Sequence, residues 1–179
     1  GTIFMHKILG AAADQGTDLD DLESLATHVL PRIKTIAVAL SAATVPEVGK
    51  PGFELADDEI EFGVGIHSEP GYRREKIKPS KQLVQELLGK LDDELHLQSD
   101  HQYAFLVNGM GATPLMDQYV FCHDLLDELA TRHIQPAFMK VGNYMTSIDM
   151  AGISLTIFDV AESQWLDYLQ YPVKTIAWS

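Results

Sequence analysis

The sequence IEFGVGIHSEPG, residues 60–71, combines the alternation of a β-strand with a proline–glycine turn. Four apolar side chains at every second position predict one buried face of a strand. They are Ile60, Phe62, Val64 and Ile66. The opposite face is nearly bare at Gly63 and Gly65, and glycine inside a strand often marks a close approach by backbone or ligand. His67 lies at the end of this bare face, immediately before the turn.

His67 is therefore the principal candidate for chemistry, because the pattern brings a single reactive side chain to a tight turn. A structural interpretation is also open. The two glycines would let a helix lie close to the sheet, and His67 would then be an ordinary histidine at a strand end. Spacing alone favours this structural interpretation.

Three further segments are as distinctive as residues 61–71, EFGVGIHSEPG. They are TVPEVGKPGFEL, VNGMGATPL and VGNYMTSIDMAGISLTIFDV. Together, and in this order, the four segments resemble the K subunit or K domain of dihydroxyacetone kinases. The resemblance covers almost all of the chain but only the second half of that protein. It implies that residues 1–179 are a single domain, the C-terminal substrate-binding domain, without the N-terminal domain. The absence of an initiator methionine also suggests a fragment.

The resemblance assigns a role to His67. In that family, the histidine of the GIHGEPG-type motif adds a ring nitrogen to the carbonyl of dihydroxyacetone and forms a covalent hemiaminal. The sequence departs from the family pattern at two positions, because Ser68 and Ala112 stand where glycine is usual. Either side chain could crowd a turn that needs positive φ.

Composition limits the possible functions. With 179 residues and 46% hydrophobic content, the chain can form one domain with a sizeable core. The formal net charge of −13 opposes binding to nucleic acid or anionic membranes, which requires clustered Lys and Arg. No apolar run approaches the roughly 20 residues of a membrane span, and residues 1–7 lack a signal-peptide pattern. A single cysteine, Cys122, excludes an internal disulfide, so the cytoplasm is the expected location.

Helical and strand patterns alternate along the chain. Helices are predicted over residues 2–15, 18–33, 80–95, 115–132 and 162–169, and strands over 35–40, 60–67, 103–107, 136–141 and 153–160. One layer of helices on a sheet of about six strands is the economical arrangement. We therefore predict an α/β fold, a two-layer sandwich with helices on one face of the sheet, and the resemblance implies that this sheet is mixed.

Several other features allow both a functional and a structural interpretation. Basic residues gather between Arg73 and Lys78, where they could receive a phosphate or simply solubilise the surface. His96, Asp100 and His101 could bind zinc, but their spacing and polar context argue against it, and we predict no metal site. The long loop over residues 41–55 is expected to be functional, and the resemblance places it on the same surface as His67. In residues 142–147, GNYMTS, a structural role is favoured for the polar side chains.

The resemblance implies a function in glycerone phosphorylation. The chain would bind dihydroxyacetone covalently through His67 for phosphoryl transfer, as part of a dihydroxyacetone kinase that works as a homodimer. No nucleotide-binding loop is present, so ADP or ATP and Mg²⁺ would belong to a separate L subunit or domain, and the phosphoenolpyruvate-dependent type is preferred. The chain alone would be inactive as a kinase. The alternative is a catalytically silent dihydroxyacetone sensor that acts as a coactivator of a transcription regulator.

Overall fold

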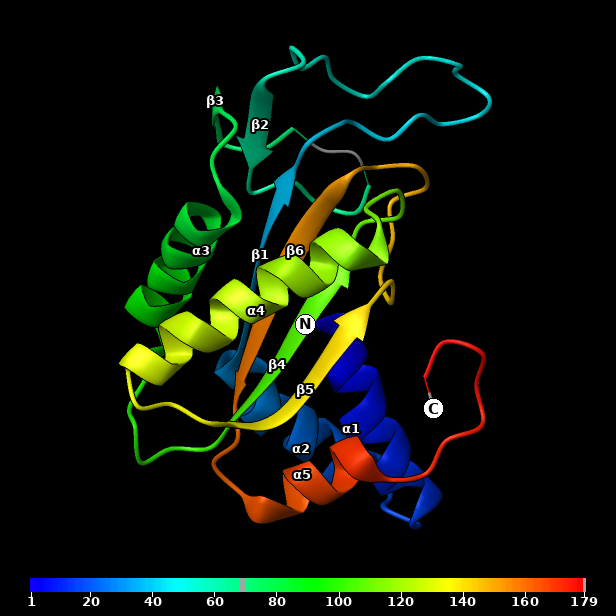
Figure 1. Ribbon diagram of the computed structural model, residues 1–179. Helices are drawn as coiled ribbons and strands as arrows, with labels where there is room; N and C mark the ends of the chain where they lie inside the picture. Colours follow the sequence, from blue (N-terminus) through cyan, green and yellow to red (C-terminus); the bar gives the residue numbers. More distant parts are fainter. Residues whose placement is uncertain (68–69, 179) are drawn as a thin grey trace.

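The computed structural model describes residues 1–67 and 70–178, and the strands of these residues form one six-stranded sheet in the order β3-β2-β1-β6-β4-β5 (Figure 1). β4 and β5 are parallel, and the other neighbouring strands are antiparallel. The strands are β1 (Ile33–Ala39), β2 (Glu59–Phe62), β3 (Arg73–Lys76), β4 (Tyr103–Gly109), β5 (Pro136–Gly142) and β6 (Gly152–Asp159). The predicted α/β class and mixed sheet are confirmed.

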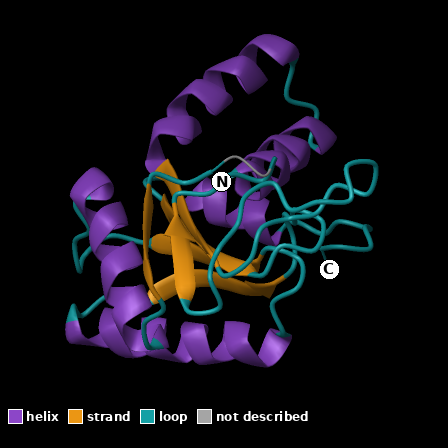
Figure 2. Cartoon of the chain, turned by 90° about the horizontal axis from the view of Figure 1, so that it is seen from above, coloured by secondary structure: helices purple, strands orange, loops and turns teal. Residues whose placement is uncertain are grey.

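The helices within the described residues lie close to the predicted ranges. They are α1 (Thr2–Asp14), α2 (Leu19–Val29), the short 3₁₀ helix η1 (Leu30–Arg32), α3 (Ser80–Leu95), α4 (Leu115–Thr131) and α5 (Ser163–Gln170). They pack on both faces of the sheet, as the view from above shows (Figure 2). The prediction that helices cover only one face is therefore wrong.

The reason for two helical layers lies in β4, where every residue is buried. Tyr103, Phe105 and Val107 point towards α3 and α4, whereas Ala104 and Leu106 join the cluster formed with α1, α2 and α5. A strand that is apolar on both faces needs cover on both faces. β4 thus separates two hydrophobic cores.

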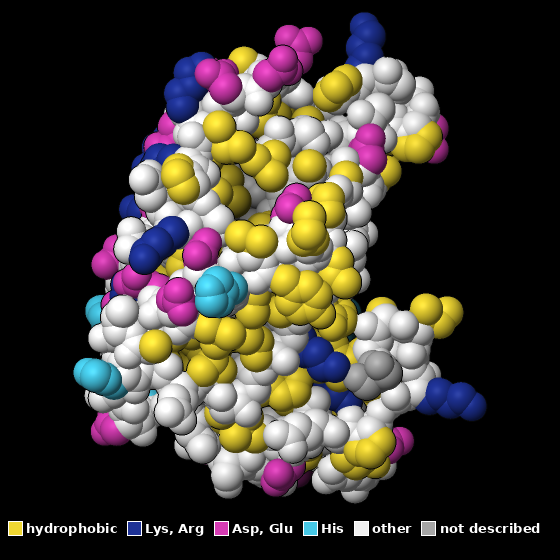
Figure 3. Space-filling view, viewed as in Figure 1, with side chains coloured by type: hydrophobic (Ala, Val, Ile, Leu, Met, Phe, Trp, Pro, Cys, Tyr) yellow, Lys and Arg dark blue, Asp and Glu magenta, His cyan; other side chains and the backbone are white. Residues whose placement is uncertain are grey.

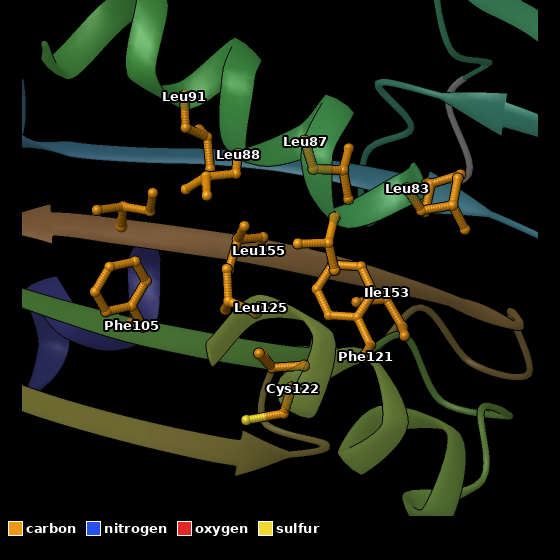
Figure 4. Close-up of a cluster of buried hydrophobic side chains, with 14 of the residues drawn as sticks. Leu83, Leu87, Leu88, Leu91, Phe105, Phe121, Cys122, Leu125, Ile153 and Leu155 are labelled. Atoms are coloured by element: carbon orange, nitrogen blue, oxygen red, sulfur yellow. The ribbon is translucent and has the colours of Figure 1, made fainter. Parts of the chain in front are cut away.

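The first core lies between the sheet and the helices α3 and α4 (Figure 4). α3 contributes leucines at helical spacing, and α4 contributes Phe121, Cys122 and Leu125 against β4 and β6. Burial raises the pKa of the Cys122 thiol. Cys122 is therefore a core residue and not a reactive nucleophile.

The C-terminal segment, residues 171–178, forms no strand and packs on the second core, the one formed with α1, α2 and α5. Trp178 is buried, and its ring stacks on Phe138 with ring centroids 5.9 Å apart. Ile176, in contrast, is fully exposed. Trp178 is therefore a core residue.

The outer side of α4 carries exposed apolar side chains, and hydrophobic atoms gather on this side of the molecule (Figure 3). The exposed large hydrophobic residues of this helix are Leu115, Met116, Tyr119, Val120 and Leu126. Within the described residues, the helices are too short or too polar to cross a lipid bilayer.

Candidate functional site

The β2–β3 connection carries His67, and it begins earlier than the sequence pattern indicated. β2 ends at Phe62 because Gly63 has φ +78°, a left-handed conformation that glycine adopts without strain. Val64 is still buried, but it packs in a different cluster from Ile60 and Phe62, and Ile66 is 37% exposed. The predicted strand over residues 60–67 is therefore wrong after Phe62.

The two ends of this connection are held together at the edge of the sheet. The Gly63 N–H donates to the Ala37 carbonyl at 2.8 Å, and the Tyr72 N–H donates to the Phe62 carbonyl at 2.9 Å. A Cβ at Gly63 would lie 2.3 Å from the Tyr72 ring, so that ring fills the space that the missing side chain leaves. The absence of a side chain at Gly63 therefore allows the Tyr72 ring to pack against the backbone there. We refer to residues 63–71 as the histidine loop.

Glu61 lies beneath this loop and is only 2% exposed. Its Oε1 accepts a hydrogen bond from the Gly71 N–H at 2.7 Å, and its Oε2 accepts one from Arg74 Nε at 3.1 Å. A buried carboxylate is stable when it is paired and hydrogen-bonded in this way. Glu61 therefore links the far end of the histidine loop to β2 and β3.

His67 lies in a turn of the histidine loop and is exposed. Its neighbours Ser68 and Glu69 lie outside the described residues, so the effect of Ser68 stays a prediction. At the other departure from the family pattern, the φ of Ala112 is not positive. Gly111 has φ +139° instead, and a Cβ there would lie 2.3 Å from the Ile148 carbonyl oxygen. Ala112 thus fits this turn without backbone strain.

All four distinctive segments meet in one small apolar cluster at the end of the sheet that carries the histidine loop. Phe53, Val64, Met110 and Met150 come one from each segment, and they pack with Ala37, Ala39 and Ala43. The long loop over residues 41–55 is therefore close to the histidine loop, as expected. Figure 1 shows these connections together at one end of the sheet.

Two polar residues fix the loops that follow β4 and β5. Thr113 Oγ1 donates to the Gly152 carbonyl at 2.6 Å and accepts from the Gly152 N–H at 2.7 Å. Asn108 is 2% exposed, and its Oδ1 accepts from the N–H groups of Tyr144 and Met145, each at 2.8 Å. Its Nδ2 donates to the Met145 carbonyl and to Ser154 Oγ. These bonds hold the backbone of residues 144 and 145, and the structural role favoured for the polar side chains of residues 142–147 stays a prediction.

A cleft of about 710 Å³ lies between the histidine loop and the face of the sheet. Residues 63–66 and Tyr72 line one side, and Met110 and Met145 also border it. The polar groups on its floor are Thr35, Asn108, Ser154 and Thr156. The Thr35 and Thr156 hydroxyls hydrogen-bond to each other at 2.8 Å. The residues that precede His67 therefore border a space large enough for a small polar molecule.

The basic residues between positions 73 and 78 are paired with carboxylates. Arg73 contacts Glu86, Arg74 contacts Glu61, and Lys76 contacts Asp58. Lys78 lies 2.5 Å from Glu75 and 2.8 Å from Glu86, and its hydrogen bonds to these two groups raise its pKa. This cluster is neutralised internally, which argues against a phosphate site.

Metal binding finds little support around the histidines considered for zinc. His96 ends α3 in a left-handed conformation, and His101 lies 3.4 Å from Asp159. Among the residues that the structure describes, no three His, Cys, Asp or Glu side chains gather as a metal site would require.

Sequence reasoning missed Glu61 and Asn108 as important residues of this region. Glu61 alternates with Ile60 and Phe62, a pattern that indicates a solvent-facing side chain. Its partner Gly71 is ten residues away and contacts it only after the loop has closed. Asn108 lies in a buried strand, and a polar residue at such a position was the available signal.

The sequence and the fold match a known domain. The chain matches the Dak1 domain over residues 1–177 and belongs to this family. One relative is the "PTS-dependent dihydroxyacetone kinase, dihydroxyacetone-binding subunit DhaK" of Lactococcus lactis, which is 60% identical over 99% of this chain and 54% of its own length. The chain thus resembles subunits of a kinase.

A second group of relatives carries a regulatory name. The "DhaKLM operon coactivator DhaQ" of Lactococcus lactis is 47% identical over 99% of this chain and 55% of its own length. The solved structure titled "Dihydroxyacetone kinase operon co-activator Dha-DhaQ" matches with a TM-score of 0.90 and 46% identity, over 99% of this chain and 54% of that chain. The chain spans about half the length of these relatives.

Proposed function

We propose that this chain binds dihydroxyacetone covalently through His67, so that a hydroxyl of the ketose is presented for phosphorylation to dihydroxyacetone phosphate. The observation that carries this proposal is the 60% identity to a subunit named for dihydroxyacetone binding. The exposed position of His67, on a loop that borders the cleft, supports it. The whole chain of the relatives would supply the remaining catalytic groups.

The covalent step adds one bond and releases nothing. A neutral ring nitrogen of His67 donates its lone pair to the carbonyl carbon, and the carbonyl electron pair moves to oxygen. That oxygen takes up a proton while the other ring nitrogen loses one, so the adduct gains the mass of a whole dihydroxyacetone molecule. Glycerol has no carbonyl and cannot form it. Covalent attachment supplies orientation that the few contacts of a three-carbon ligand could not.

Phosphoryl transfer is assigned to a larger assembly. The nucleotide and Mg²⁺ are proposed to belong to a separate L subunit, and the kinase is proposed to be of the phosphoenolpyruvate-dependent type, working as a homodimer in the cytoplasm. The name of the 60% identical relative contains the words "PTS-dependent", which support phosphoenolpyruvate as the phosphoryl donor. The chain by itself is then expected to make no triose phosphate from dihydroxyacetone and ATP or a charged L subunit.

Intact-protein mass spectrometry tests the capture step. Wild-type protein should gain one dihydroxyacetone mass with the ketone and nothing with glycerol, and His67→Ala should gain nothing. His123→Ala removes an exposed histidine on α4 and serves as the matched control. The adduct should weaken in acid, because an imidazolium has no free lone pair. An adduct that survives His67→Ala and lacks one water would instead indicate a lysine Schiff base.

A dihydroxyacetone sensor is the second candidate function, and the 46% identity to the operon co-activator structure favours it. Covalent capture would be retained in this case, so adduct formation does not separate the two functions. An assay of phosphoryl transfer by the full-length protein with a charged L subunit separates the two functions. Formation of dihydroxyacetone phosphate supports the kinase, whereas capture without any turnover supports the sensor.

A further inference from the structure

Glu61 contacts the far end of the loop that carries His67, and it does not face the solvent as its alternation with apolar residues suggested. It is 2% exposed, and its two carboxylate oxygens have different partners, the Gly71 N–H and Arg74 Nε. One oxygen therefore holds the loop, and the other holds the neighbouring strand.

The fit at Gly71 shows how closely this end of the loop approaches β2. A Cβ at Gly71 would lie 1.9 Å from the Phe62 carbonyl oxygen and 2.9 Å from Glu61 Cγ. The adjacent Tyr72 N–H donates to the same Phe62 carbonyl. The loop end is thus in contact with the strand backbone, with the Glu61 carboxylate as its side-chain anchor.

The opposite end of the loop is fixed independently of Glu61. Gly63 is bonded to Ala37, and Val64 is buried among Phe53, Met110 and Met150. At the start of the histidine loop, Gly63 and Val64 are therefore anchored by backbone pairing and burial. At its far end, Glu61 holds the Gly71 N–H and the Phe62 carbonyl holds the Tyr72 N–H. Losing the carboxylate would remove the side-chain bond that holds Gly71.

We propose that Glu61 is a positioning residue for His67, which holds the far end of the histidine loop so that the imidazole is presented to a carbonyl ligand at the cleft. This inference rests on the proposed capture of dihydroxyacetone. A charge-assisted hydrogen bond to a backbone N–H is short and strong, and displacement of a reacting group by about 1 Å can slow a reaction about a hundredfold. Glu61 acts through the loop and does not touch the ligand.

Three variants test the proposal, namely Glu61→Ala, Glu61→Gln and the control Glu86→Gln. Glutamine keeps an oxygen that can accept a hydrogen bond from the Gly71 N–H. Glu61→Gln should therefore retain most of the rate of adduct formation that Glu61→Ala loses. Glu86 is a partly buried carboxylate, with 19% of its side chain exposed, that bonds to Arg73 and Lys78 beside the same strand pair. Its hydrogen bonds within the described residues are not to the loop. Glu86→Gln removes ion pairs comparable to the Glu61–Arg74 pair and should leave the capture of dihydroxyacetone unchanged.

Two measurements are made on each variant, at a temperature at which circular dichroism shows it folded. The first is the rate of adduct formation with dihydroxyacetone, which Glu61→Ala should slow about tenfold or more. The second is amide hydrogen exchange over residues 63–72, which should quicken in Glu61→Ala only. Unchanged exchange, unchanged capture, or equal slowing by Glu86→Gln would overturn the proposal. A wild type without any adduct would refute the proposed capture itself, while exchange would still show whether Glu61 holds the loop.

Discussion

Replacing Asn108 by leucine should destabilise the protein strongly, although the two side chains are similar in size. Asn108 satisfies the N–H groups of Tyr144 and Met145 and the Met145 carbonyl, all at 2.8 Å. Leucine would leave these three backbone groups unpaired. Each buried group that is left unpaired costs about 1–3 kcal/mol. Because Tyr144 and Met145 are only half-buried, we take the lower end, which gives about 3 kcal/mol in all.

Urea denaturation measures this loss as a lower midpoint with an unchanged slope. A loss of this size is a large share of the roughly 5–15 kcal/mol that stabilises a typical domain. Ser154→Ala is the matched control, because it removes one partner of Asn108 and leaves the backbone bonds intact, for an expected loss of about 1 kcal/mol. If Asn108→Leu lowered the stability no more than Ser154→Ala, the anchoring role of Asn108 would be refuted.

Two further predictions concern the surroundings of the histidine loop. Gly71→Ala should slow adduct formation by up to about a hundredfold, because relief of the contact with the Phe62 carbonyl requires a shift of about 1 Å or more. The control is Gly89→Ala, at an open helical position, which should leave adduct formation unchanged. Burial raises the pKa of Glu86, but hydrogen bonds from Lys78 and Arg73 outweigh this and hold it below its ordinary value of 4.5. The stability that Glu86 contributes is thus fully present above about pH 4.5 and lost as the pH falls through the lowered pKa. Urea midpoints of wild type and Glu86→Gln should therefore converge in acid, and a constant difference would contradict this.

The helices were predictable because their apolar residues recur at helical spacing. In α3, Leu83, Leu87 and Leu91 lie on one side of the helix and all of them are buried. The prediction of a single helical layer failed at β4, whose continuous apolar run already indicated burial on both faces. A count of helices does not say on which side of a sheet each one packs.

The site was only partly predictable for a different reason. His67 could be selected from its motif, but alternation continued through Val64 and Ile66 after the strand had ended, because burial at residue 64 comes from a separate cluster. Glu61 and Asn108 act through bonds to residues 10 to 46 positions away. Such partners depend on how the chain closes in three dimensions, which local periodicity does not contain.

The pairing of β1 with β6 has a consequence for how the protein folds. Ile33 is opposite Phe158 and Ala39 is opposite Gly152, so the middle of the sheet joins segments that are synthesised far apart in time. Closing so long an intervening loop before any contact is gained makes folding slow. During synthesis, the β1 edge that later receives β6 would stay open until residues 152–158 leave the ribosome. A nascent chain that is arrested before Gly152 should therefore be sensitive to protease and prone to aggregation.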